Sequence, residues 1–132
     1  MLTSEPVHED TLPDRSILIV EDDATLGKLL LEVLQEETNY QVHLVPDAET
    51  ALNMLQTVTP ELFLLDYHLP GMSGLELADQ LRSREDGKHV PILIMSADLP
   101  YVDIAKKQLK SLQKPFDLDA FLLTITELLA PS

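Results

Sequence analysis

Short apolar runs alternate along this chain with longer segments in which apolar residues recur every three or four positions. The first run covers residues 16–20, and the segment after it places Leu26, Leu29, Leu30, Val33 and Leu34 at the spacing of one helix face. A short continuous apolar run is typical of a strand buried on both faces, and the longer spacing is typical of an amphipathic helix. The pattern therefore predicts a strand followed by a helix.

The same alternation continues to the end of the chain. Further strands are predicted at residues 40–45, 62–65, 91–95 and 111–113. Asp47, Ser73 and Asp117 each stand before a helix-period segment and can cap it, and Glu76 completes a capping box with Ser73. A fourth helix is predicted at residues 99–109, where the apolar positions are sparse.

Five strands that alternate with five helices predict successive βαβ units with right-handed crossovers. The fold class is therefore α/β, a doubly wound five-stranded parallel sheet with helices on both faces. A length of 132 residues suits a single domain. We assign residues 15–130 to this domain and expect residues 1–14, which are polar and acidic, to form a flexible or disordered N-terminal tail.

Charge and composition narrow the classes of function. The chain carries 9 basic and 23 acidic residues, a net charge of -14, which opposes direct binding to nucleic acid or to an anionic membrane. It has no cysteine, so disulfides, thiolate catalysis and cysteine-based zinc sites are excluded. No apolar stretch approaches the roughly 20 residues of a membrane span, and residues 1–14 do not resemble a signal peptide. We expect a cytoplasmic protein.

Carboxylates follow two of the predicted strands. Glu21, Asp22 and Asp23 come after the first strand, and Asp66 ends the third. The carboxyl ends of neighbouring parallel strands lie side by side, and two like charges about 4 Å apart cost about 4 kcal/mol at an intermediate dielectric constant. A divalent cation would offset this repulsion, and an all-oxygen site suits Mg²⁺. Glu21, Asp22 and Asp66 are the candidate metal ligands, and Asp23 is read as a helix cap.

Two more polar residues fall at the same edge of the predicted sheet. Ser96 follows the fourth strand and Lys114 follows the fifth. Taken singly, each is more often a turn or surface residue. Beside the acids they would complete a phosphoryl-transfer site. A carboxylate can attack phosphorus to form an aspartyl-phosphate, and Mg²⁺, an ammonium group and a hydroxyl can stabilise the phosphoryl oxygens.

Two stretches of the chain resemble the receiver domain of two-component response regulators. Residues 17–23 read ILIVEDD and resemble the first strand of that family with its acidic pair, and residues 64–74 read LLDYHLPGMSG and resemble its phosphoacceptor segment. The resemblance covers about residues 15–129. It implies the flavodoxin-like (βα)5 fold with strand order 2-1-3-4-5, as in the chemotaxis regulators of the family.

The resemblance also implies roles for individual residues. Asp66 would be the phosphorylated aspartate, and Glu21 and Asp22 would form the acidic pocket for Mg²⁺. The backbone carbonyl of His68, two residues past the acceptor, would be a further metal ligand. Ser96 and Lys114 match the Ser/Thr and lysine positions of the family site.

Three further positions are judged against the family pattern. The peptide bond between Lys114 and Pro115 is expected to be cis. The side chains of His68 and Asp98 would lie over the site and tune the lifetime of the phosphoryl group.

One departure from the family concerns the switch. Members usually carry an aromatic residue three positions before the lysine, and here that position is Ser111. In the family, Ser96 would move inward on phosphorylation and the aromatic would follow it. A switch in this chain would use another element, with Tyr101 a candidate whose alternative reading is an ordinary surface tyrosine.

A basic cluster stands out on this acidic chain. Lys106, Lys107 and Lys110 fall on or near the predicted fourth helix, with Asp103 at the spacing of an ion pair. A solvated helix face is the plain interpretation, and a docking patch for an acidic partner is the alternative.

The resemblance predicts a phosphorylation-controlled signalling module rather than a conventional enzyme. It would take a phosphoryl group from a histidine kinase or phosphotransfer protein onto Asp66 and act on an effector at the face built by the fourth helix, fifth strand and fifth helix. The chain stops after the fifth helix, so we expect it to act through a partner unless it is part of a longer regulator or hybrid kinase. A pseudo-receiver that binds partners without phosphorylation is the alternative. A nucleotide-binding enzyme is disfavoured because no phosphate-cradling glycine loop is present.

Overall fold

The computed structural model describes residues 15–98 and 100–130 of the chain. The tail expected at residues 1–14 lies outside the described residues. Within them, no helix combines the length and apolar character that crossing a bilayer requires.

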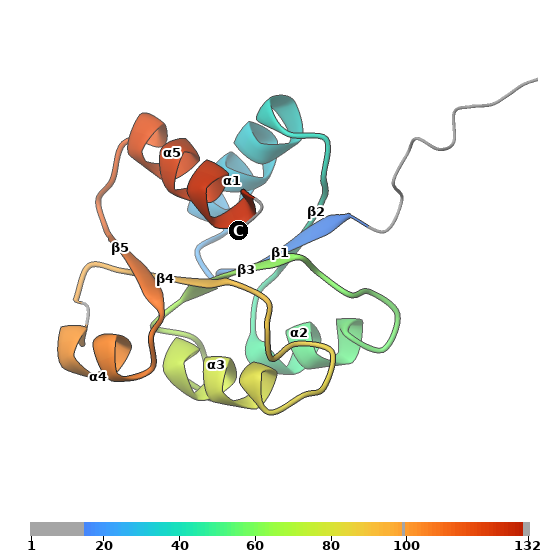
Figure 1. Ribbon diagram of the computed structural model, residues 1–132. Helices are drawn as coiled ribbons and strands as arrows, with labels where there is room; N and C mark the ends of the chain where they lie inside the picture. The colour runs from blue at the N-terminus through green and yellow to red at the C-terminus, as the bar shows by residue number, and fades with distance from the viewer. Residues whose placement is uncertain (1–14, 99, 131–132) are drawn as a thin grey trace, which may run out of the picture.

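The described residues form a five-stranded parallel sheet in the order β2-β1-β3-β4-β5 (Figure 1). The strands are β1 (Ser16–Val20), β2 (Gln41–Val45), β3 (Leu62–Asp66), β4 (Ile92–Ser96) and β5 (Lys110–Gln113). Every residue of β1, β3 and β4 is buried, as continuous apolar runs require in a sheet covered on both faces. The predicted fold class and strand order are confirmed, and the strand ends differ from the prediction by at most one residue.

Five helices connect and follow the strands. They are α1 (Ala24–Glu37), α2 (Ala48–Met54), α3 (Gly74–Arg82), α4 (Tyr101–Lys106) and α5 (Leu118–Leu129). Helices α1 and α5 cover one face of the sheet, and α2, α3 and α4 cover the other (Figure 1). Two apolar cores result, one on each face, with Phe121 the largest buried side chain of one and Phe63 of the other.

The helix starts follow the predicted caps. The Asp23 carboxylate accepts hydrogen bonds from the backbone N–H groups of Thr25 and Leu26 at 3.0 and 3.1 Å, so its role as a cap is confirmed. Asp47 and Asp117 cap α2 and α5 in the same way. The capping box of α3 is present, because the Ser73 and Glu76 side chains each bond the other residue's backbone. These caps satisfy N–H groups that a helix leaves free.

Helix α4 is shorter than the sequence predicts. It covers six residues rather than 99–109, and Leu99 lies outside the described residues. Its N-cap, Pro100, makes no side-chain capping hydrogen bond, and Ile104 is its one buried residue. The helix stops where Gln108 takes a positive φ of 56°, which lets the N–H groups of Gln108 and Leu109 bond the carbonyls of the last turn. Because α4 is short and buries only Ile104, the sequence of this region shows few apolar residues at helical spacing.

The lysine cluster does not form one helix face. Lys106 ends α4, Lys107 is its C-cap and Lys110 belongs to β5. The Lys107 ammonium bonds the Asp79 carboxylate of α3 at 2.9 Å, so the predicted pairing with Asp103 is wrong for Lys107. The sequence could not reveal this partner because it lies 28 residues away.

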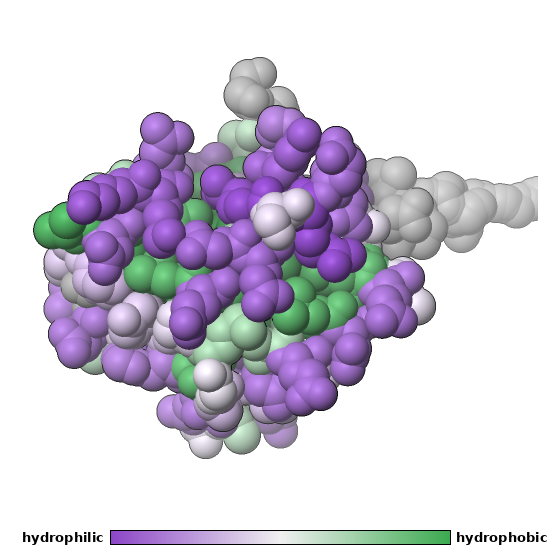
Figure 2. Space-filling model, turned by 90° about the horizontal axis from the view of Figure 1, so that it is seen from below, coloured by the Kyte–Doolittle hydropathy of each residue, from purple (hydrophilic) through white to green (hydrophobic). Residues whose placement is uncertain are grey.

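Viewed from the side of α2, α3 and α4, the surface is mostly hydrophilic, with smaller hydrophobic patches between the charged side chains (Figure 2).

Candidate functional site

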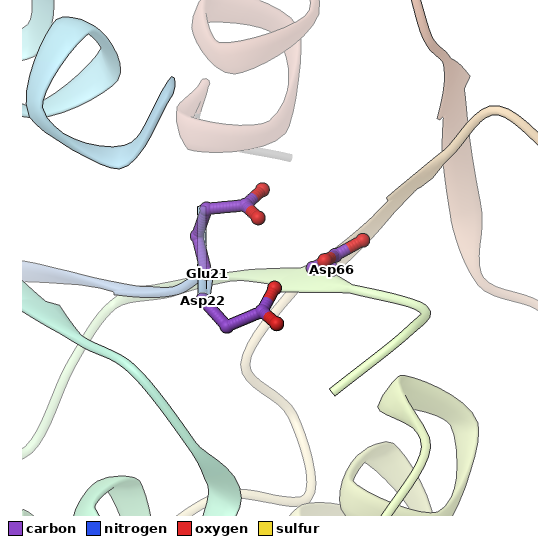
Figure 3. A group of neighbouring side chains, drawn as sticks. All are labelled: Glu21, Asp22 and Asp66. Atoms are coloured by element: carbon purple, nitrogen blue, oxygen red, sulfur yellow. The ribbon is translucent and has the colours of Figure 1, made fainter. Parts of the chain in front are cut away.

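Three carboxylates meet at the carboxyl edge of the sheet. Glu21 and Asp22 follow β1, Asp66 ends the neighbouring β3, and the first two side chains turn toward the third (Figure 3). One oxygen from each lies within 4.8 Å of the others. Glu21 and Asp66 are buried, at 3% and 5% exposure, and Asp22 is exposed. The structure therefore brings together the three acids that the sequence selected.

The donor set fits a hard divalent cation. Two oxygens bound to one Mg²⁺ at about 2.1 Å lie at most about 4.2 Å apart. The three carboxylate oxygens lie within 4.8 Å of one another, so small side-chain movements would bring them to that separation. All three donors are carboxylates, the ligand type that Mg²⁺ prefers. The exposure of Asp22 leaves one side open to water, which Mg²⁺ usually keeps as additional ligands.

Lys114 supplies the cationic group that the structure places among these acids. Its ammonium donates to Glu21 Oε1 at 3.0 Å and to Asp66 Oδ1 at 3.3 Å. The backbone N–H of Lys114 donates to the Ser96 carbonyl at 2.9 Å, which fixes the start of the loop after β5. The following peptide bond to Pro115 is cis, as expected.

Burial and pairing shift the pKa values of Glu21 and Lys114. Burial raises the pKa of Glu21, and this effect outweighs the hydrogen bonds from Lys114 and the Asp23 backbone, which lower it. Burial lowers the pKa of Lys114, but its hydrogen bond with Glu21 and the charges of Glu21 and Asp66 outweigh that effect and raise the pKa overall. The lysine is therefore a fixed cation at neutral pH.

The loop after Asp66 packs directly on the acceptor strand through Gly74. A Cβ at this position would collide with the backbone carbonyl oxygen of Asp66 and lie 3.0 Å from Tyr67 Cα. The Gly74 N–H donates to the Tyr67 carbonyl at 2.8 Å. Sequence reasoning placed the start of α3 here but missed the close approach, because the backbone that Gly74 meets is set by folding.

Ser96 ends β4 beside Asp66 and is 1% exposed. Its Oγ accepts a hydrogen bond from the backbone N–H of Asp98 at 3.1 Å. The Ser96 hydroxyl can also donate a hydrogen bond, so it could bind the oxygen of a ligand at this edge of the sheet. The Asp98 side chain is exposed.

His68 follows the acceptor on the exposed loop. Its backbone N–H makes a long hydrogen bond of 3.4 Å to Asp66 Oδ1, and its imidazole stands edge-on to the Tyr67 ring at 4.7 Å between centroids. The side chain is exposed above the buried carboxylate. The structure thus places both candidate tuning residues, His68 and Asp98, at the rim of the site.

A hollow of about 440 Å³ opens beside Lys114. It is lined by Asp23, Leu26, Ala97, Lys114, Pro115 and Phe116. The hollow thus opens at the carboxyl edge of the sheet, next to the lysine of the site.

The candidate switch residues lie next to the site without touching the carboxylates. Ser111 is half-buried in β5, and Gln113 shares its face because side chains two apart on a strand point the same way. The Tyr101 hydroxyl, from the first residue of α4, donates to Gln113 Oε1 at 2.7 Å. Gln113 was missed by sequence reasoning, since nothing in its local sequence marks it.

Comparison with known proteins identifies the family. Residues 17–126 match the response regulator receiver domain, so the chain belongs to this family of two-component signalling proteins. It is 46% identical over 81 residues to the two-component response regulator PhoP of Pseudomonas aeruginosa, which covers 61% of this chain and 35% of that protein. It is 38% identical over 95 residues to the DNA-binding response regulator MtrA of Mycobacterium tuberculosis, 72% of this chain and 40% of that protein. The chain thus spans less than half the length of these curated relatives.

Solved structures agree with this assignment. The response regulator TrrA of Thermotoga maritima, solved in complex with Mg²⁺ and BeF, is 31% identical, with a TM-score of 0.76 over 87% of this chain and 99% of that one. The chemotaxis protein CheY4 of Vibrio cholerae gives a TM-score of 0.80 over 87% of this chain and 98% of that one, and at 24% identity this likeness concerns the fold. The prediction of a receiver domain is confirmed.

Proposed function

We propose that residues 15–130 form a phosphoacceptor receiver domain in which Asp66 takes a phosphoryl group from the phosphohistidine of a histidine kinase or phosphotransfer protein. The observation that carries this proposal is the convergence of a buried Asp66, two further acids and the Lys114 ammonium at one edge of the sheet. Folding alone does not favour this arrangement, because buried like charges repel.

Each residue has a chemical role in the proposed transfer. An Asp66 carboxylate oxygen attacks phosphorus, an O–P bond forms, and the bond from phosphorus to the donor nitrogen breaks, with its electron pair leaving on the imidazole. Lys114 and the Ser96 hydroxyl donate hydrogen bonds to the phosphoryl oxygens. Glu21, Asp22, Asp66 and the His68 carbonyl would hold Mg²⁺ in the acidic pocket. When bound, Mg²⁺ neutralises negative charge that gathers on the phosphoryl group.

Intact mass spectrometry tests this proposal. The protein is incubated with Mg²⁺ and acetyl phosphate, and the expected result is a gain of one phosphoryl group that is absent in Asp66→Asn and in the presence of EDTA. Asp119→Asn, an exposed aspartate on α5 away from the site, is the matched control and retains the gain. A wild-type protein that folds and gains no mass would instead support the pseudo-receiver, which the presence of every site residue disfavours.

We propose that His68 and Asp98 set the lifetime of the acyl phosphate. Both are exposed beside the buried acceptor, where a side chain controls the approach of water. Release of phosphate from labelled protein should change in His68→Ala and Asp98→Ala. Unchanged rates in both variants would exclude this role.

We propose that α4 responds to phosphorylation through Tyr101 rather than through an aromatic residue at position 111. Lys114 contacts Asp66, and the residue before Lys114, Gln113, accepts the hydrogen bond of the Tyr101 hydroxyl. Gln113 also pairs with Ser96 across β4 and β5. A shift of Lys114 or Ser96 would therefore displace the first turn of α4. Tyr101→Phe keeps the ring and removes the hydrogen bond. Mg²⁺ and beryllofluoride should change the hydrogen-exchange rates of the α4 amides in wild type, and this change should be smaller in Tyr101→Phe. A change of equal size in the variant would contradict the proposal.

We further propose that an effector binds the face formed by α4, β5 and α5. Both helices of this face carry exposed apolar side chains, Val102 and Tyr101 on α4 and Leu123 on α5, at 69%, 56% and 61%. Direct nucleic-acid binding by this chain is not proposed, because its net charge is -14. Val102→Asp and Leu123→Asp should weaken effector binding, whereas the control Leu29→Asp on α1 should not. Equal binding by all three variants would contradict the proposed surface.

A further inference from the structure

A separate pocket lies at the amino edge of the sheet, where β1 begins, away from the acids and Lys114 (Figure 1). We call it the amino-edge pocket, and its volume is about 730 Å³. Its wall is built from the first residues of β1 and β2, the loop between α2 and β3, and the residues that precede β4. Pockets of this size are typical of sites for small molecules, and phosphoryl transfer at the opposite edge gives this one no role.

Backbone hydrogen bonds hold the wall of the amino-edge pocket together. The Gln41 N–H donates to the Arg15 carbonyl at 2.9 Å, and the Glu61 N–H donates to the Ser16 carbonyl at 2.8 Å. These bonds join three segments that are far apart in sequence. Pro60, whose ring restricts its φ, is buried in the same wall. The pocket is therefore largely formed before any ligand arrives.

Polar side chains line the amino-edge pocket from several of these segments. They carry three hydroxyls, an amide, a carboxylate and an imidazole, on Ser16, Thr57, Thr59, Gln41, Glu61 and His89. Ser16 is only 2% exposed, so it belongs to the enclosed part of the wall. Hydroxyl, amide and carboxylate oxygens all accept hydrogen bonds. The pocket therefore suits a ligand that donates several hydrogen bonds.

Glu61 gives the amino-edge pocket a negative charge. Among the described residues that line it, none is a lysine or an arginine. Nearby Lys88 pairs with Glu85 at 3.3 Å, and the Arg15 guanidinium lies over the Tyr40 ring, 5.8 Å from its centroid. The net charge of -14 also concentrates cations near the surface of the chain. A cationic ligand is therefore favoured, and phosphates and other anions are disfavoured.

The remainder of the wall is apolar and favours an organic cation over a metal ion. Val58, Pro60, Val90 and Pro91 line the pocket beside the polar groups. Methylene groups pack well on such surfaces while a charged head group stays with polar partners. An ammonium group donates three hydrogen bonds, which suits one carboxylate and neighbouring neutral oxygens. Ca²⁺ or Mg²⁺ would need more oxygen ligands and usually more than one carboxylate.

We propose that the amino-edge pocket binds a small aliphatic amine, with the ammonium group at Glu61 and the aliphatic chain along Val58 and Val90. This binding is independent of phosphoryl transfer. Strand β3 runs from Leu62, next to the pocket, to Asp66, and its four steps of about 3.3 Å separate the two by about 13 Å. A bound amine therefore does not touch the phosphoacceptor.

An NMR titration with n-pentylamine, without any phosphodonor, tests this site. The backbone amide signals of Thr59, Glu61 and His89 should shift and reach saturation. Pentanol, which has the same chain and no ammonium group, should cause no such shifts. Shifts spread over the acidic surface without saturation, or no shifts at all, would overturn the proposal.

Two variants separate the charge of the pocket from its shape. Glu61→Gln should weaken pentylamine binding at least about tenfold, because charge-assisted hydrogen bonds are the stronger ones. Thr59→Phe keeps every charge and fills part of the pocket from an exposed position, so it should also weaken binding at least about tenfold. The amide spectrum of each variant reports whether it is folded.

Glu127→Gln is the matched control for the loss of one negative charge. Glu127 is exposed on α5 and does not line the pocket, so this variant should bind pentylamine as wild type does. Equal affinity in wild type and Glu61→Gln, or equal losses in Glu61→Gln and Glu127→Gln, would overturn the proposal.

A second probe, Nα-acetyl-lysine amide, distinguishes a free amine from a lysine side chain of another protein. Pentylamine should bind at least as tightly as this probe. If the lysine probe binds at least tenfold more tightly, the pocket belongs to a protein lysine and the small-amine site is overturned. Since none of these measurements uses a phosphodonor, their failure is distinct from failure of acetyl phosphate to label the wild-type protein.

Discussion

At the scale of single residues, the site depends on close contacts that leave little freedom. The Lys114 ammonium lies between the carboxylates of Glu21 and Asp66. Gly74 lets the loop after β3 pack against the backbone of Asp66. Each contact fixes the position of a reactive atom relative to the sheet. Substitutions here should therefore affect stability and chemistry together.

Gly74→Ala should destabilise the protein and impair labelling of Asp66. The added Cβ would meet backbone atoms of Asp66 and Tyr67, which cannot move aside without shifting β3. Overpacking of this kind costs about 1–3 kcal/mol, measurable by urea denaturation.

Gly71→Ala is the matched control for this substitution. Its φ is +81° and nothing lies within 4 Å of its Cβ position, so it should cost about 1 kcal/mol through backbone strain alone. Acetyl phosphate labelling should be retained in this variant. An equal loss of labelling in Gly74→Ala and Gly71→Ala would show that backbone strain in this loop, and not the contact of residue 74 with Asp66, impairs phosphorylation.

The stability that Lys114 provides should disappear at high pH. Its pKa is raised in the folded protein by Glu21 and Asp66, so it stabilises the fold fully below its ordinary pKa of about 10.4 and loses this effect as pH rises through the folded value. Urea denaturation in EDTA should show wild type more stable than Lys114→Met at neutral pH. The difference should narrow above about pH 10.4, and a constant difference would mean that Lys114 acts through packing.

At the scale of elements, α4 is the shortest helix of the described residues and is weakly anchored. It has six residues, one buried side chain and no side-chain cap, and its contacts with the rest of the protein include the Lys107–Asp79 ion pair and the Tyr101–Gln113 hydrogen bond. Elements with few buried contacts open at low free energy. Such an element can change position in response to a change at the site.

Gln108→Gly should stabilise the end of α4. Gln108 has a φ of 56° and is exposed, and this conformation costs a residue with a Cβ about 1 kcal/mol more than glycine. Urea denaturation should show a gain of up to about 1 kcal/mol. Gln56→Gly, at an exposed position with negative φ, is the control and should not stabilise the protein.

At the scale of the whole molecule, the edge of the sheet joins two chain segments that are far apart in sequence. Glu21 and Lys114 are separated by 93 positions and meet at 3.0 Å. The order β2-β1-β3-β4-β5 puts β1 and β3 side by side at the centre, which places their terminal acids together. Lys114 offsets only part of the repulsion among three carboxylates, so the acids should lower the stability of the molecule in the absence of a divalent cation.

Mg²⁺ should therefore stabilise the fold. A ligand that binds only the native state adds about 2.7 kcal/mol when its concentration is 100 times its Kd. The melting temperature should rise with added Mg²⁺ in wild type and rise much less in Asp22→Asn. Asp23→Asn, which keeps a capping side chain next to the site, is the control and should respond as wild type does.

The order of strands and helices and the fold class could be predicted from the sequence, and candidate site residues could be selected from it. Apolar periodicity reports burial, and caps such as Ser73 and Asp117 act within one turn, so both can be read locally. Glu21, Asp22, Asp66, Ser96 and Lys114 could be selected because strand ends in a parallel sheet share an edge.

Which of these groups bond to one another depends on how the elements pack in three dimensions. The two oxygens of Glu21 are taken by Lys114 and the Asp23 backbone, Lys107 pairs with Asp79, and Tyr101 reaches Gln113. The early end of α4 likewise follows from the positive φ of Gln108. Glutamine does not favour this backbone conformation, so the sequence gives no sign of it. Contacts of this kind depend on the packing of distant segments to within a few tenths of an ångström, and no local pattern of residues encodes that.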